Sequence, residues 1–210
     1  MINKVKAVIF DMDGVLIDAR DWHFESLNKA LGLFGSEITR YDHLVTFDGL
    51  PTKKKLEMLS LEGGLPLNLH NFINDLKQEY TWEVVYKKCK PIFQHRYALS
   101  KLKSEGYVLS VCSNSVKKTI ELMMERSGLM PYLDFFLSNQ DVVNGKPDPE
   151  IYYKAIERMG LLPNECLIIE DNQNGVKAAI ASGAHLLKVE NPNDVTYQNI
   201  IKRIKEIENA

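Results

Sequence analysis

The stretch VIFDMDGVLID, residues 8–18, leads three apolar residues directly into two aspartates, Asp11 and Asp13. A short apolar run of this kind is typical of a buried strand, and ligands of α/β proteins bind beyond the carboxyl ends of such strands. If the chain stays extended through Met12, both carboxylates point to the same side, where they repel each other unless a cation or proton intervenes. Gly14 then permits a tight turn. A strand that ends in exposed acids would have the same sequence, so both interpretations stay open.

Further short runs rich in valine, isoleucine and leucine also predict strands. With the first strand, the predicted set is Val5–Phe10, Tyr107–Cys112, Phe135–Ser138, Cys166–Glu170 and Leu186–Val189. Helical patterns separate the later runs, and Thr196–Asn209 predicts a closing helix. Strands that alternate with helices indicate a parallel sheet with crossover helices. We therefore expect an α/β fold with a Rossmann-like parallel sheet core.

The segment of residues 18–90 breaks this alternation, because no strand is evident in it. Three helical stretches follow one another there, over Asp21–Leu33, Thr52–Leu61 and Leu69–Lys88. We expect residues 18–90 to form a helical domain. This domain would be inserted into an α/β core made of residues 1–17 and 91–210.

The bulk composition excludes several classes of protein. The 210 residues are 45% hydrophobic and 26% charged, which suits a globular protein with a substantial core. A formal net charge of −2 argues against a general binder of nucleic acid or of anionic membranes. We expect neither a signal peptide nor a membrane span, because the first apolar stretch is short and no apolar run reaches membrane length. Cys89, Cys112 and Cys166 lack the spacing of a disulfide framework or zinc site. We expect a cytoplasmic protein with reduced thiols. The sequence does not fix the oligomeric state and is compatible with a monomer.

Polar residues also follow the second and fourth predicted strands. Ser113, Asn114 and Ser115 place hydroxyls and an amide at the start of a helix, where a helix N-terminus favours anions. Ser115 is also a suitable N-cap for that helix. Glu170 and Asp171 add two carboxylates at the same edge of the sheet.

A lysine completes this set of polar residues. Lys146 lies in a loop that Pro147 makes rigid, close to the start of another helix. Taken singly, the serines could cap a helix, Lys146 could be a solvated loop residue, and Asp171 could be an N-cap. These purely structural interpretations do not explain why acids, a hydroxyl and a lysine all converge on one edge of the sheet.

Four segments of the chain resemble the four motifs of the haloacid dehalogenase superfamily, in the order that the family uses. They are DMDGV (11–15), VCSNS (111–115), GKPDPEIY (145–152) and IIEDNQNGVKAA (168–179). The helical insertion directly after the first motif resembles the cap of the subclass that contains β-phosphoglucomutase and many small-molecule phosphatases. The resemblance covers essentially the whole chain, and four motifs together are far more specific than any one. It implies an α/β core with an inserted α-helical cap domain.

The resemblance also implies a mechanism. Asp11 would be the nucleophile that attacks phosphorus and forms an aspartyl-phosphate. Asp13, placed two residues later as in the phosphotransfer members, would protonate the leaving alcohol and then take a proton from the attacking water. A Mg²⁺ ion would be bound by Asp11, by the backbone carbonyl of Asp13, by Asp171 and by Glu170, the last directly or through water.

The transferred phosphoryl group would be held by other motif residues. Ser113 and the backbone at Asn114 would bind its non-bridging oxygens. Lys146 would neutralise one of these oxygens and orient Asp11, since catalysis of phosphoryl transfer is mostly positioning and charge stabilisation.

We therefore expect a Mg²⁺-dependent phosphatase for a small phosphorylated metabolite, either a sugar phosphate or the phosphate of a polyol or amino alcohol. The alternative is a phosphosugar mutase of the β-phosphoglucomutase type, in which the phosphoryl group passes to a second sugar hydroxyl instead of to water. A signalling receiver domain fits less well, because its phosphoacceptor ends the third strand. Ser138, Asn139 and Gln140 offer no obvious acceptor at that place.

Substrate choice is expected to depend on the cap. His23 aligns with the family's first cap helix, whose histidine often reaches the site; a packed or exposed helix histidine is the alternative. Thr52 resembles an N-cap, yet the lysines of residues 53–55 follow in the first turn, where the helix dipole disfavours cations. This segment aligns with the family's substrate-specificity loop, so Lys53 is a candidate substrate contact, against a merely solvated basic turn. Lys77 is a weaker candidate.

Overall fold

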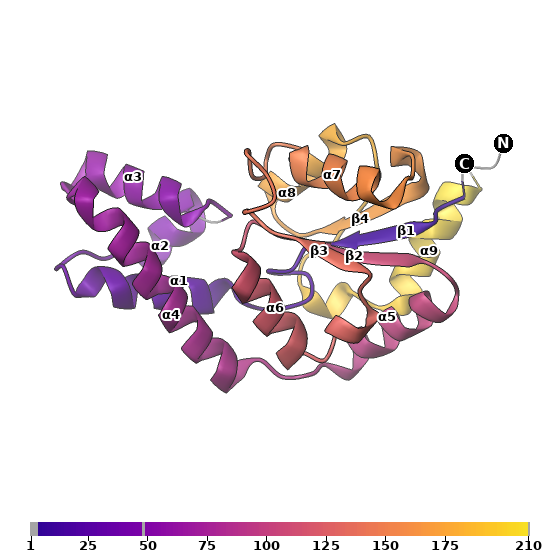
Figure 1. Cartoon of the computed structure of the whole chain (residues 1–210), viewed down its shortest axis with the longest axis horizontal. Coiled ribbons are helices and arrows are strands. Elements are labelled where there is room, and N and C mark those ends of the chain that lie inside the picture. The colour runs from indigo at the N-terminus through magenta and orange to yellow at the C-terminus, as the bar shows by residue number, and fades with distance from the viewer. Residues whose placement is uncertain (1–3, 48, 210) are drawn as a thin grey trace. The chain divides into compact units, whose positions relative to one another are not determined.

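The computed structural model describes residues 4–47 and 49–209, and the chain divides into two compact units (Figure 1). The first unit comprises Met1–Asp18 and Lys90–Ala210, and the second comprises Ala19–Cys89. The first unit is therefore discontinuous in sequence: the chain leaves it after Asp18 and re-enters it at Lys90.

A five-stranded parallel sheet forms the centre of the first unit. Its strands are β1 (Ala7–Phe10), β2 (Val108–Cys112), β3 (Phe135–Leu137), β4 (Cys166–Glu170) and β5 (His185–Lys188). The strand order is β3-β2-β1-β4-β5, so β1 lies between β2 and β4 and pairs Phe10 with Val111 and Ile169. This arrangement confirms the predicted α/β fold with a parallel sheet. It also brings the carboxyl ends of β1, β2 and β4 together.

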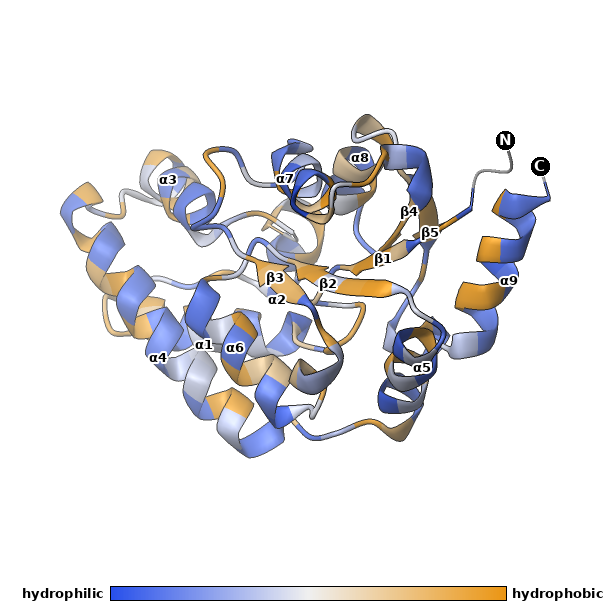
Figure 2. Cartoon of the chain, turned by 45° about the vertical axis from the view of Figure 1, so that its right-hand side comes forward, coloured by the Kyte–Doolittle hydropathy of each residue, from blue (hydrophilic) through white to orange (hydrophobic). Residues whose placement is uncertain are grey.

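Helices cover both faces of this sheet, with α7 and α8 on one face and α5, α6 and α9 on the other (Figure 1). These helices are α5 (Phe93–Ser104), α6 (Lys117–Arg126), α7 (Glu150–Met159), α8 (Gln173–Ala181) and α9 (Tyr197–Glu208). Short 3₁₀ turns lie at Met130–Tyr132, Pro163–Glu165 and Pro192–Asp194. Every residue of β1 and β4 is buried, which explains why their sequences are continuously apolar instead of alternating. Figure 2 shows the same contrast between hydrophobic strands and the mixed surfaces of the helices.

The second unit is helical. Its elements are α1 (Arg20–Gly32), α2 (Arg40–Asp42), a π-helical turn (His43–Phe47), α3 (Thr52–Gly63), a 3₁₀ turn (Leu67–Leu69) and α4 (His70–Lys88). It has an apolar core of its own, formed by Leu27, Ala30, Leu31, Ile38, Phe47, Leu56, Leu65 and Ile73. The helices over residues 40–47 were not predicted, because one or two turns are too short to show a helical period of apolar residues. No helix among the described residues is long and apolar enough to cross a membrane.

Two helix starts differ from the sequence prediction. α6 begins at Lys117 with Val116 in the N-cap position, so Ser115 does not cap it. α3 begins at Thr52 itself with Pro51 in the N-cap position, so Thr52 does not cap α3 either. The side chain of Ser115 has a different hydrogen-bond partner, described below.

Candidate active site

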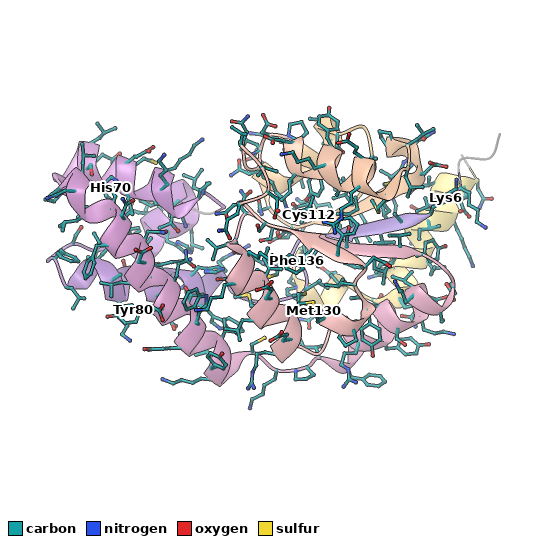
Figure 3. The ribbon with its side chains drawn as sticks, in the orientation of Figure 1. Lys6, His70, Tyr80, Cys112, Met130 and Phe136 are labelled. Carbon is teal, nitrogen blue, oxygen red and sulfur yellow. The ribbon has the colours of Figure 1, made fainter. Side chains whose placement is uncertain are left out.

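The candidate site lies where the carboxyl ends of β1, β2 and β4 meet. Asp11, Ser113 and Asp171 each come directly after one of these strands. Because the three strands are parallel neighbours, residues more than a hundred positions apart arrive at one edge of the sheet. Figure 3 labels Lys6, just before β1, and Cys112, the last residue of β2; the site lies at the Cys112 end.

A buried lysine joins all three of these strand ends. Lys146 Nζ donates to Asp11 Oδ1 at 2.7 Å, to the carbonyl of Cys112 at 2.8 Å and to Glu170 Oε1 at 2.6 Å. The three protons of the ammonium group thus match three acceptors. Burial lowers the pKa of Lys146, but the charges of Asp11 and Glu170 outweigh this effect and raise the pKa above its ordinary value. Lys146 is therefore a fixed cation at neutral pH.

The acidic groups still outnumber this cation. Burial, followed by the charge of Glu170, raises the pKa of Asp11 well above its ordinary value, and Lys146 only partly opposes the rise. Two buried carboxylates face one ammonium group, and Asp171 adds a third carboxylate beside them. A second positive charge would allow Asp11 and its neighbours to be ionised together.

The donor set fits the predicted ion. One carboxylate oxygen from each of Asp11, Glu170 and Asp171 lies within 4.8 Å of the others. Mg²⁺ is a hard cation that prefers carboxylate and other oxygen ligands. The excess of negative charge at this site also favours binding of a cation over binding of an uncharged molecule. These three residues would hold the ion. Their ligand roles, like that of the Asp13 carbonyl, stay predictions.

Two glycines allow the carboxylates to lie this close to the backbone. At Gly14, which has φ +93°, an added Cβ would lie 2.0 Å from Asp171 Oδ2. At Gly175 in α8, an added Cβ would lie 2.0 Å from both the carboxyl carbon and Oε1 of Glu170. Gly14 is thus needed for the close approach of the Asp171 carboxylate as well as for the turn. The role of Gly175 was not predicted, because nothing in the sequence shows that α8 passes against Glu170.

Alanine at position 175 should therefore be costly. The Glu170 carboxylate cannot simply move aside, because Lys146 and Tyr152 hold it. We expect Gly175→Ala to lower the free energy of unfolding by about 1–3 kcal/mol, as overpacked cores do. The matched control is Gly32→Ala, since Gly32 is also helical and an added Cβ there meets nothing within 4 Å. Urea denaturation of both variants tests this; equal stability of the two would contradict the account.

The serines after β2 connect to the first motif. Ser113 Oγ accepts a hydrogen bond from the backbone N–H of Ser115 at 3.1 Å. Ser115 Oγ in turn donates to Asp13 Oδ2 at 2.9 Å. The Ser115 hydroxyl thus contacts the proposed acid/base residue, in place of the N-cap role that the sequence predicted. Ser113 itself is buried at this edge of the sheet.

Asn114 fixes the loop that carries the lysine. Its Oδ1 accepts from the backbone N–H of Lys146 at 3.0 Å, and its Nδ2 donates to the Lys146 carbonyl at 3.2 Å. Gly145 lets the loop approach, because a Cβ there would lie 2.8 Å from Asn114 Oδ1. Only the backbone of Asn114 was predicted to take part in the site, so this contact of its side chain is an additional finding.

A tyrosine also enters the site without having been predicted. Tyr152 is fully buried on α7, and its hydroxyl donates to Glu170 Oε1 at 2.5 Å. The available signal was the apolar spacing of Tyr152, Ala155 and Ile156, which lie on the buried face of α7. Such spacing indicates burial but does not identify a hydrogen-bond partner on another element.

The predicted cap residues lie in the helical unit. His23 Nδ1 on α1 and Lys77 Nζ on α4 are 3.2 Å apart, and Lys77 is buried. Lys53 lies in the first turn of α3, with an exposed side chain. His23 and Lys77 thus form a polar pair within this unit, whereas the structure does not show Lys53 joining them. Their contacts with a substrate stay predictions.

Comparisons with known proteins identify the family of the chain. Residues 8–189 match the family described as Haloacid dehalogenase-like hydrolase. The chain is 31% identical over 179 residues to "Phosphorylated carbohydrates phosphatase" of Thermotoga maritima, covering 85% of this chain and 82% of that protein. It is 29% identical to "Pyrophosphatase PpaX" of Bacillus velezensis, covering 86% and 81% of the two chains.

A solved structure supports the same fold. The crystal structure of β-phosphoglucomutase from Clostridium difficile superposes with a TM-score of 0.83 at 21% identity, over 96% of this chain and 98% of that one. The family match spans all four motifs, which include Asp11, Ser113, Lys146 and Asp171. The chain belongs to the haloacid dehalogenase-like hydrolases.

Proposed function

We propose that this protein is a Mg²⁺-dependent phosphatase that hydrolyses a small phosphomonoester through an aspartyl-phosphate on Asp11. The observation that supports it most is the setting of Asp11. Its carboxylate is buried at the centre of the sheet edge, with one oxygen held by Lys146 at 2.7 Å. A held carboxylate with one remaining oxygen is suited to in-line attack on a single phosphorus atom.

In the first step, an oxygen of Asp11 bonds to phosphorus and the ester oxygen leaves. Asp13 gives that oxygen a proton, so that a neutral alcohol departs. Ser113 and the backbone N–H of Asn114 would bind the phosphoryl oxygens. Lys146 contributes its charge and the orientation of Asp11, because its three protons already point to Asp11, Cys112 and Glu170.

In the second step, water attacks the phosphorus of the aspartyl-phosphate. Asp13, now a carboxylate, takes a proton from this water, inorganic phosphate leaves, and the Asp11 carboxylate is restored. Ser115 donates to Asp13 Oδ2, which keeps the acid/base group in one place through both steps. Bound Mg²⁺ would supply positive charge that lowers the repulsion between the Asp11 carboxylate and the anionic substrate.

The substrate class is proposed from the residues and from one relative. The relative from T. maritima is named for phosphorylated carbohydrates. On that basis we rank sugar phosphates first, followed by phosphates of polyols and amino alcohols. We infer that selection among them depends on the helical unit, with His23 and Lys53 as the candidate contacts. Lys77, the neighbour of His23, is the third.

A phosphate-release panel tests this function. We expect Mg²⁺-dependent release from small phosphomonoesters, and loss of release when the ion is chelated. Inorganic pyrophosphate belongs in the panel, because one relative is named a pyrophosphatase. Release that is unchanged by chelation would contradict the proposal.

The same assay separates hydrolysis from the mutase alternative. Both reactions use Asp11 and Asp13 in the same way up to the aspartyl-phosphate, and they differ in whether water or a second sugar hydroxyl accepts the phosphoryl group. With a glucose monophosphate as substrate and a trace of a glucose bisphosphate, a hydrolase releases inorganic phosphate in step with substrate loss. An isomerised sugar phosphate without net release of phosphate would establish the mutase instead.

A further inference from the structure

We propose that Tyr152 is a positioning residue that sets the orientation of the Glu170 carboxylate for the metal ion. The inference rests on the proposed Mg²⁺ site. It goes beyond that site, because Tyr152 contacts neither substrate nor ion and would act only through Glu170.

The first evidence is the contact itself. Tyr152 and Glu170 are both fully buried, and the Tyr152 hydroxyl donates to Glu170 Oε1 at 2.5 Å. A buried phenol needs a partner for its O–H, and a buried carboxylate needs donors for its charge. The helix α7 thus contributes one neutral donor directly to the end of β4.

The second evidence is how the two oxygens of Glu170 are used. Oε1 accepts from both Lys146 at 2.6 Å and Tyr152 at 2.5 Å. Among the described residues, the contact at Oε2 is the weaker one, from the backbone N–H of Asp171 at 3.2 Å. Two short hydrogen bonds on Oε1 therefore leave Oε2 as the oxygen available to an ion.

The third evidence is the close packing of α8 against the Glu170 carboxylate. Gly175 lies against the carboxylate so closely that an added Cβ would be 2.0 Å from its carbon. With Tyr152 and Lys146 holding one oxygen and α8 packed against the group, rotation of the carboxylate is restricted. Without the Tyr152 hydroxyl, Lys146 alone would hold Oε1, and the carboxylate could turn toward the ammonium group.

This assigns separate tasks to the two donors. Lys146 supplies charge and also holds Asp11, so its removal would disturb the nucleophile. Tyr152 adds direction without charge. Its ring also lies beneath Lys146 Nζ, 4.9 Å from the ring centroid, but a phenylalanine keeps that contact, so loss of the hydroxyl alone should affect Glu170. Residues that orient metal ligands in this way are typically responsible for 10–100-fold of metal affinity.

The test is Tyr152→Phe, which removes one buried oxygen and keeps the ring. The control is Tyr153→Phe, the neighbouring residue, which is 49% exposed and donates its hydroxyl to the carbonyl of Ala181. Titration calorimetry with Mg²⁺ at constant ionic strength and without substrate measures affinity apart from turnover. We expect the Mg²⁺ dissociation constant to rise about tenfold or more in Tyr152→Phe and less than about twofold in Tyr153→Phe.

A double-mutant cycle excludes a purely structural effect of Tyr152. We compare Glu170→Gln with the double variant that also carries Tyr152→Phe. The Mg²⁺ dissociation constants of these two proteins should differ by less than about twofold, because the group through which Tyr152 acts has changed. If wild type binds Mg²⁺ and Tyr152→Phe binds it equally well, the inference is wrong while the metal site stands. If Tyr152→Phe weakens binding equally in both backgrounds, the inference is also wrong. If wild type does not bind Mg²⁺, the metal site and the inference are overturned together.

Discussion

Asp11→Asn should reduce phosphate release by about 10⁴-fold or more, the scale of loss seen when a covalent nucleophile is removed. Asparagine has nearly the same shape but an amide that does not attack phosphorus. Its Oδ1 can still accept from Lys146, which donates to that position at 2.7 Å in the wild type. Steady-state phosphate release measures the effect, and normal turnover of the variant would refute covalent catalysis.

Folding stability provides the control for this variant. Because the folded chain raises the pKa of Asp11 above its ordinary value of 3.8, ionising Asp11 costs folding free energy as the pH rises above that value. The neutral asparagine avoids this cost. At neutral pH without Mg²⁺, Asp11→Asn should therefore be at least as stable as wild type in urea denaturation. An inactive variant that is also strongly destabilised would indicate a structural role instead.

Asp13→Asn should bind substrate normally and lose about 10²–10⁴-fold in turnover, the usual contribution of a general acid/base. The loss should depend on the leaving group. An alkyl phosphate needs a proton in the first step, whereas p-nitrophenyl phosphate releases a stable phenolate without one. With p-nitrophenyl phosphate we expect a rapid burst of nitrophenolate followed by slow turnover, because only the second step is impaired.

Ser115→Ala provides a graded control for the Asp13 variant. It removes the hydrogen bond to Asp13 Oδ2 and keeps the carboxyl group. A hydrogen bond to a charged group contributes about 1.5–3 kcal/mol, so the loss in turnover should be about 10- to 100-fold and without a burst. Full activity of Asp13→Asn on alkyl phosphates would contradict the acid/base role.

The central strands of the sheet could be predicted because they are buried on both faces. β1 and β4 are fully buried, so they appear as continuous apolar runs between polar segments. The strand ends were less certain: β1 begins at Ala7, two residues after the predicted start, and β5 ends at Lys188, one residue early. Hydrogen bonding decides these ends, whereas the apolar pattern records only burial.

The residues at the centre of the site could be predicted for a related reason. Asp11, Ser113 and Asp171 each follow a strand directly, so the fold alone brings them to one edge of the sheet. Lys146 arrives on a loop. Its place beside Pro147 made it a candidate, and the resemblance to a family motif gave it a role, before its contacts with Asp11 and Glu170 were known.

What could not be predicted depends on packing between elements distant in sequence. Ser115 has the side chain and position of an N-cap, yet α6 begins two residues later and its hydroxyl turns to Asp13. Tyr152 and Gly175 have meaning only because α7 and α8 pack against Glu170. No spacing within one segment encodes such contacts.

Mapping of a trapped phosphoryl group tests the central claim most directly. Asp13→Asn protein is incubated with p-nitrophenyl phosphate and Mg²⁺, quenched in acid, digested and sequenced by tandem mass spectrometry. We predict one phosphoryl group per chain, attached to Asp11 and absent when Asp11 is also changed to asparagine. A phosphoryl group on another residue, or a burst of nitrophenolate that leaves no phosphoryl group on Asp11, would contradict the account.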